Sequence, residues 1–125
     1  MKFLLLVLNM IMCLSSCSAQ QKLTNKDHNP CEGMSKMETM ECKLQIIDSL
    51  NSDISDLIDV LSDKFKKESK FLSVQKEWQL YSDSHCESYL DVLGGSNQTQ
   101  IILYDCKIEM LKTRITSLEM FEEIN

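Results

Sequence analysis

The sequence predicts an all-α fold, a small antiparallel three-helix bundle in which a disulfide ties the last two helices as a hairpin. Three observations lead to this prediction. Apolar residues recur every three or four positions along three stretches, two adjacent glycines separate the second stretch from the third, and cysteines lie at similar distances on either side of those glycines. Helix-breaking residues are also rare, since the 125 residues include three glycines and one proline.

The first predicted helix covers about residues 35–67, with no glycine or proline inside it. Its apolar positions keep helical spacing over several turns: Met40, Leu44, Ile47, Leu50, Ile54, Leu57, Leu61 and Phe65. Four aspartates, which we call the acidic stripe, fall largely on the opposite face: Asp53, Asp56, Asp59 and Asp63. The stripe is either a solvated outer face or a surface that meets a basic protein. It is not a calcium loop, because it lies within a helix and lacks the required glycine turn.

A helical hairpin is predicted around Gly94-Gly95-Ser96, because glycine can end one helix and serine can cap the next. The second helix would start after an N-cap at Ser69 and run to about Leu93. Its apolar face would comprise Phe71, Val74, Trp78, Ser82, His85, Tyr89 and Val92. The third helix would cover about residues 97–122. Its apolar face would comprise Ile101, Tyr104, Ile108, Leu111, Ile115 and Leu118.

The N-terminus reads as a targeting segment: Met1-Lys2 is positive, and residues 3–14 form an apolar run too short to cross a membrane. Leu14-Ser15-Ser16-Cys17 has the form of a bacterial lipobox. We therefore predict a lipoprotein signal peptide over 1–16, lipidation of Cys17, a polar tether over 17–30 and a helical domain over 31–125. The anchor would place the protein at the bacterial outer membrane or in the periplasm. The alternative is an ordinary secretory peptide cut after Ala19, which would give a soluble secreted protein.

The exported chain is acidic. The whole chain has a formal net charge of −6, and loss of Lys2 with the signal peptide leaves 12 basic against 19 acidic residues, or −7. This balance argues against nucleic acid and against a basic helix on a membrane surface. It suits a cationic partner, such as a basic protein.

Four cysteines remain after Cys13 leaves with the signal peptide and Cys17 takes the lipid, an even number that predicts two disulfides among three possible pairings. We favour Cys86–Cys106, because eight residues before Gly94 and ten after Ser96 come level in an antiparallel hairpin. The remaining pair, Cys31–Cys42, requires a non-helical segment that folds back on the first helix. A zinc site is disfavoured, since no C-x-x-C or H-x-x-x-H spacing occurs. We expect no metal and no cofactor.

No catalytic constellation can be assembled from the sequence. Adjacent helical residues point about 100° apart, so His85 and Cys86 cannot act as base and nucleophile. A serine elbow, a phosphate loop and an HExxH motif are all missing from the sequence, so we predict that the protein is not an enzyme. Trp78 is better explained as core than as a ligand platform. Arg114, the only arginine, is predicted to pair with Asp83.

The hairpin residues also carry a family resemblance. Gln75-x-x-Trp78-x-x-Tyr81-x-Asp83-x-x-Cys86, followed by Gly94-Gly95-Ser96, Cys106, Arg114 and Leu118, resembles the N-terminal domain of LprI-type lysozyme inhibitors. That family's pattern is roughly AQxxWxxYRDxxC, GGS, C and TxxRxxEL. Upstream, Leu50-Asn51, Cys31 and Cys42 agree with it as well. The sequence departs from the pattern at Ser82, Ile54, Leu111 and Ser117, where the family has Arg, Tyr, Thr and Glu.

The resemblance implies an exported binding protein that inhibits lysozyme through protein–protein contact. Two surfaces are candidates for that contact: the acidic stripe and the exposed turn at Ser96-Asn97. The alternative is a structural or interaction protein of the envelope that has no lysozyme partner. Its oligomeric state is not indicated by the sequence.

Overall fold

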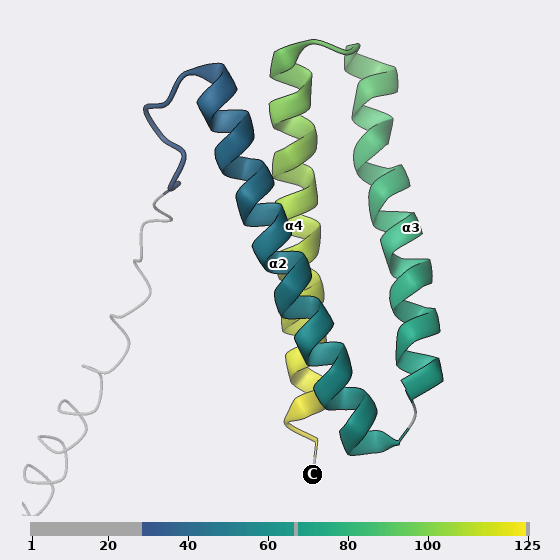
Figure 1. Cartoon of the computed structure of the whole chain (residues 1–125). Coiled ribbons are helices and arrows are strands. Elements are labelled where there is room, and N and C mark those ends of the chain that lie inside the picture. The colour runs from purple at the N-terminus through teal and green to yellow at the C-terminus, as the bar shows by residue number, and fades with distance from the viewer. Residues whose placement is uncertain (1–28, 67, 125) are drawn as a thin grey trace, which may run out of the picture.

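The computed structural model describes residues 29–66 and 68–124, and over these ranges the chain forms three helices. They are α2 (Lys36–Phe65), α3 (Glu68–Leu93) and α4 (Asn97–Glu122). Figure 1 shows that α2 and α4 run in the same direction and cross, while α3 runs antiparallel to both. The predicted all-α bundle is therefore confirmed. The predicted signal peptide, lipidation site and most of the tether lie outside the described residues.

Capping residues set the ends of α2. The Ser35 hydroxyl accepts a hydrogen bond from the Glu38 amide, and the Glu38 carboxylate accepts one from the Ser35 amide at 2.9 Å, which forms a capping box. Lys66 ends the helix in a left-handed conformation, with φ 50°. This residue reverses the chain at once, so α3 begins at Glu68. The predicted N-cap at Ser69 is wrong, because Ser69 already lies in the first turn of α3.

The turn between α3 and α4 has the predicted chemistry. Gly94 takes the left-handed conformation, with φ +79°, and its amide donates to the Leu90 carbonyl oxygen at 2.9 Å. The Ser96 hydroxyl then accepts a hydrogen bond from the Thr99 amide at 3.2 Å and caps α4. A side chain at position 94 would be strained by the backbone alone, so glycine is favoured at this tight reversal.

The buried core lies between α2 and α4, which pack more extensively with each other than either does with α3. All the buried members of the core cluster come from these two helices: Ile47, Ile54, Ile58, Leu61, Ile108, Leu111 and Leu118. From α3, only Phe71 and Trp78 pack against this cluster, and both are partly buried. The bundle is therefore an α2–α4 pair against which α3 is held more loosely.

The apolar face predicted for α3 is partly wrong. Val92 is 81% exposed, and Val74, His85 and Tyr89 are also exposed. Ser82 is buried as predicted, and Cys86, which was not among the predicted positions, is fully buried because its disulfide fixes which side of α3 meets α4. The predicted faces of α2 and α4 are closer to the structure. Leu44 is exposed, however, and the buried residues Ile58 and Leu103 were not among the predicted positions.

Two disulfides close the fold, in the pairing that we favoured. Cys86 and Cys106 join α3 to α4, with their Cα atoms 5.7 Å apart. Cys31 and Cys42 join the segment before α2 to its second turn, with their Cα atoms 5.9 Å apart. Cys31 lies in a turn that is stabilised by the Asn29 side chain, which accepts a hydrogen bond from the Cys31 amide. The non-helical segment required for the second pairing is therefore present.

Candidate binding surfaces

The acidic stripe lies on the outer face of α2, and all four of its aspartates are exposed. The stretch from Leu44 to Asp63 contains five aspartates and no lysine or arginine. None of the four stripe carboxylates forms an ion pair within the described residues. From Asp53 to Asp63 the stripe is about 15 Å long at 1.5 Å rise per residue. It is a rigid row of unneutralised negative charges.

The second candidate surface, the turn at Ser96-Asn97, is also exposed but lies elsewhere. Figure 1 shows the α3–α4 turn at the end of the bundle where α2 begins. The acidic stripe occupies the second half of α2, toward the other end. The structure therefore does not bring the two candidate surfaces together, and Asn97 does not extend the stripe.

The motif residues of the hairpin form contacts between α3 and α4. Arg114 Nε donates a hydrogen bond to Gln75 Oε1 at 2.9 Å, and the guanidinium carbon lies 5.6 Å from the centre of the Trp78 ring. Partial burial lowers the pKa of Arg114, because desolvation disfavours its charged form. Trp78 itself is half-buried at the edge of the core, as predicted.

The predicted Asp83–Arg114 pair is wrong. Asp83 Oδ1 lies 3.1 Å from Lys107 Nζ, and Asp83 Oδ2 accepts a hydrogen bond from Gln79 Nε2 at 3.2 Å. The reason is helical register. With Cys86 facing Cys106 in an antiparallel pair, Asp83 comes level with about residue 109, and Arg114 lies about 7 Å further along α4. The disulfide spacing already in the sequence could have excluded the pair.

Tyr81 is the motif residue that faces away from the hairpin contacts. It is 62% exposed, and its ring stacks on His85 with the ring centres 5.9 Å apart. Cys86, next to His85, is oxidised and fully buried, so no free thiol is present at this position. The motif thus divides into residues that hold α3 on α4 and one exposed aromatic residue.

Two features were missed by the sequence analysis. Lys43 is only 5% exposed, and its ammonium pairs with Asp105 across the α2–α4 interface. The sequence did contain a signal for the burial of Lys43, since this residue lies one turn before Ile47 on the apolar face of the helix. The second feature is a cavity of about 460 Å³ between the first turns of α3 and the last turns of α4. Its walls come from two helices, so no single stretch of sequence reveals it.

Within residues 29–66 and 68–124, no group of three histidine, cysteine, aspartate or glutamate residues could hold a metal ion. Over this same part, no helix is both long enough and apolar enough to span a membrane.

The family model for lysozyme inhibitor LprI matches residues 17–118. The chain belongs to the LprI lysozyme inhibitor family. The match covers more than four fifths of the sequence and includes both disulfides and the Gln75–Arg114 contact. Comparisons with curated proteins and with solved structures found no significant match. The LprI family is thus a family of enzyme inhibitors, and it gives this bundle a functional class at family level.

Proposed function

We propose that this LprI family member is an exported, lipid-anchored protein of the bacterial envelope that inhibits lysozyme by direct protein–protein contact, with the acidic stripe as the contact surface. The family match over residues 17–118 carries the proposal. That match begins at the position where we expect the exported, lipidated chain to begin. The structure contributes a surface whose charge suits the partner.

Charge favours the stripe over the α3–α4 turn. Lysozymes that attack bacteria are typically basic, so an exposed row of carboxylates would steer them toward α2. Each stripe aspartate is exposed and lacks a cationic partner within the described residues, so binding does not require an internal ion pair to break. Asn97 is uncharged and offers no comparable attraction.

The opposite face of α2 keeps the stripe rigid. Ile54, Ile58 and Leu61 lie under the stripe segment and are buried against the rest of the bundle. The backbone of this surface is therefore ordered before binding, which lowers the entropic cost of association. Inhibition would follow from steric cover of the lysozyme cleft, where two carboxylates act on the glycan. No chemical step on this chain is required.

The test uses residues 17–125 with Cys17→Ser, a chain that contains every described residue and carries no acyl group; we call it the soluble chain. It is added in molar excess to a basic lysozyme acting on bacterial cell walls, and lysis is followed by turbidity. The stripe variant replaces all four aspartates by asparagine. The matched control neutralises four exposed acidic residues outside the stripe: Glu77→Gln, Glu87→Gln, Asp91→Asn and Glu119→Gln.

We expect the soluble chain to slow lysis, the stripe variant to lose inhibition and the control to keep it. Both variants change the net charge by the same amount, so only the location of the charge separates them. Inhibition should also weaken as salt is raised, because exposed charges are screened. Undiminished lysis at large excess would refute the lysozyme proposal and favour an envelope protein with another partner. Equal loss in both variants would refute the stripe as the contact surface.

The lipid anchor has its own test. The full chain and its Cys17→Ser variant are expressed in a Gram-negative host, and the membrane fraction is analysed by intact mass. We expect the full chain to begin at Cys17 and to carry acyl chains, since stable anchoring needs more than one chain. A soluble product that begins at Gln20 would support the ordinary secretory peptide instead.

A further inference from the structure

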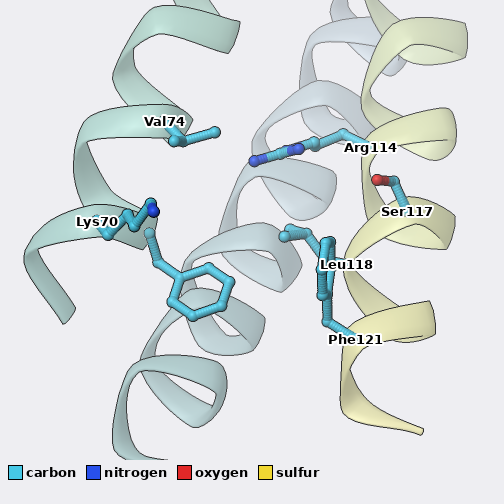
Figure 2. Close-up of a pocket in the computed structure, with 7 residues that line it drawn as sticks. Lys70, Val74, Arg114, Ser117, Leu118 and Phe121 are labelled. Atoms are coloured by element: carbon cyan, nitrogen blue, oxygen red, sulfur yellow. The ribbon is translucent and has the colours of Figure 1, made fainter. Parts of the chain in front are cut away.

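The cavity between α3 and α4 combines apolar walls with cationic groups. It measures about 460 Å³, and its lining consists of Lys70, Phe71, Val74, Arg114, Ser117, Leu118 and Phe121. Figure 2 shows Lys70 and Val74 on α3 facing Arg114, Ser117 and Leu118 on α4. Arg114 extends from α4 across the upper side of the cavity. The cavity is therefore largely apolar and has one cationic side chain on each wall, Lys70 on α3 and Arg114 on α4.

The charge of this hollow is opposite to that of the whole chain. The protein has a net charge of −6, yet the residues that the structure describes in the cavity lining include one lysine, one arginine and no carboxylate. Arg114 uses Nε for its hydrogen bond to Gln75, and no described carboxylate forms an ion pair with it. Its two terminal nitrogens are therefore available as donors to an anion.

A second, smaller hollow of about 220 Å³ continues the apolar surface. It shares Phe71 and Phe121 with the cavity and adds Phe65 and Ile124. The rings of Phe71 and Phe121 meet edge to face, with their centres 6.2 Å apart, between the two hollows. Phe121 is 43% exposed, so a bound ligand can contact its ring from the solvent side.

We propose that this cavity binds a single-chain amphiphilic anion, which has a carboxylate or phosphate head group on an apolar body. The head group lies between Lys70 and Arg114. The apolar body packs on Phe71, Leu118 and Phe121 and points toward the smaller hollow. A fatty acid and an alkyl phosphate share this chemistry.

Size separates this ligand class from a macromolecular partner. A volume of about 460 Å³ lies in the range of roughly 300–1,000 Å³ that small-ligand sites occupy. The α4 wall runs from Arg114 to Phe121, about 10 Å at 1.5 Å rise per residue. An α-helix with side chains is about 10–12 Å wide, so a partner helix would not fit inside. A linear alkyl chain of about ten carbons would fit inside the cavity.

The experiment measures binding to the soluble chain by isothermal titration and by the fluorescence of Trp78, the only tryptophan, which contacts Arg114. The probes are decanoate, decyl phosphate, decanol and decyltrimethylammonium, each below its micellar concentration. We expect both anions to bind and to change the Trp78 emission. Decanol should bind about tenfold more weakly, since it lacks the charge that Arg114 recognises. The cation should not bind.

Variants then locate the site. Lys70 is exposed, so Lys70→Gln should weaken anion binding about two- to fivefold, in the range expected for one exposed charge pair. Lys76→Gln removes an exposed lysine from the same helix outside the cavity and should change nothing. Ser117→Phe should fill the cavity and abolish binding. Val74→Phe repeats that block from α3, in case the first substitution disturbs folding, and circular dichroism checks both.

Several outcomes would overturn the proposal. These are binding of neither anion, equal binding of decanol and the anions, and equal effects of Lys70→Gln and Lys76→Gln. Binding to vesicles of anionic phospholipid without binding of the monomeric anions would also overturn it, because that result indicates a membrane-facing surface instead. No lysozyme is present in these measurements, so their result is separate from the proposed inhibition.

Discussion

Removal of the Cys86–Cys106 disulfide should release α3 from the rest of the bundle. No residue of α3 belongs to the buried core cluster, and Phe71 and Trp78 are the only described residues of α3 that pack against this cluster. Beyond these, the described side-chain hydrogen bonds and ion pairs from α3 to α4 are Gln75–Arg114 and Asp83–Lys107. The disulfide is therefore the main tie that keeps the helix docked, and Cys86→Ala/Cys106→Ala is the direct perturbation.

The size of the effect follows from the closed loop. The two cysteines are 20 residues apart, for which the chain-entropy relation gives about 3 kcal/mol of stabilisation. Cys86 is fully buried, so loss of its sulfur also leaves a small void that lowers stability further. A loss of about 3 kcal/mol is large against the roughly 5–15 kcal/mol by which folded domains are stable.

Urea unfolding followed by two signals tests this reasoning. Trp78 fluorescence reports on α3, and far-ultraviolet circular dichroism reports on all the helices. We expect coincident transitions in the soluble chain, but in Cys86→Ala/Cys106→Ala the Trp78 transition should come at lower urea. The control is Cys31→Ala/Cys42→Ala, whose loop of 11 residues predicts a similar loss of nearly 3 kcal/mol but no separation of the signals. Coincident transitions in the first variant, or a loss below about 1 kcal/mol, would refute the argument.

Three further predictions concern single contacts. Gly94→Ala should lower the free energy of unfolding by about 1–2 kcal/mol because of its left-handed backbone, whereas Gly95→Ala, at an ordinary φ in open space, should cost less in the same urea assay. Asp105→Asn should destabilise more than Lys43→Met, because the first leaves a buried ammonium without its counter-charge and the second leaves an exposed carboxylate in water; equal losses would contradict this. Hydrogen bonds from the Ser35 hydroxyl and the Ser35 amide lower the pKa of the Glu38 carboxyl, so the contribution of Glu38 to stability should be full at neutral pH and be lost as pH falls through this lowered pKa. The stability difference from Glu38→Gln, measured against pH, checks that sign.

The fold could be predicted from the sequence because its signals are local. A serine followed three residues later by glutamate specified the start of α2, and a glycine pair followed by serine specified the hairpin turn. The cysteine spacing around that turn was enough to favour the observed pairing. Each of these features depends on neighbours within about 20 residues of sequence, which helical geometry converts directly into distance.

The orientation of α3 and the cavity could not be predicted in the same way. The helix has apolar residues on several sides, and Val92 and Tyr81 remain exposed while Ser82 is buried. Its buried face is decided by contacts with α4, including those of Arg114 and Lys107. Apolar periodicity alone does not tell whether these polar contacts or the burial of a valine will decide the orientation of the helix. The cavity depends on the same orientation of α3, because its lining residues come from both α3 and α4.

The α2–α4 core also leaves two surfaces of opposite charge that should act independently. The acidic stripe faces outward from α2, and the cavity with Lys70 and Arg114 lies between α3 and α4. The two sites share no residue, and additivity holds for distant sites without common partners. The stripe variant should therefore bind decanoate as the soluble chain does, and Ser117→Phe should still slow lysozyme. A loss of inhibition in folded Ser117→Phe would show that lysozyme contacts the α3–α4 face, and the assignment of the contact to α2 would then be wrong.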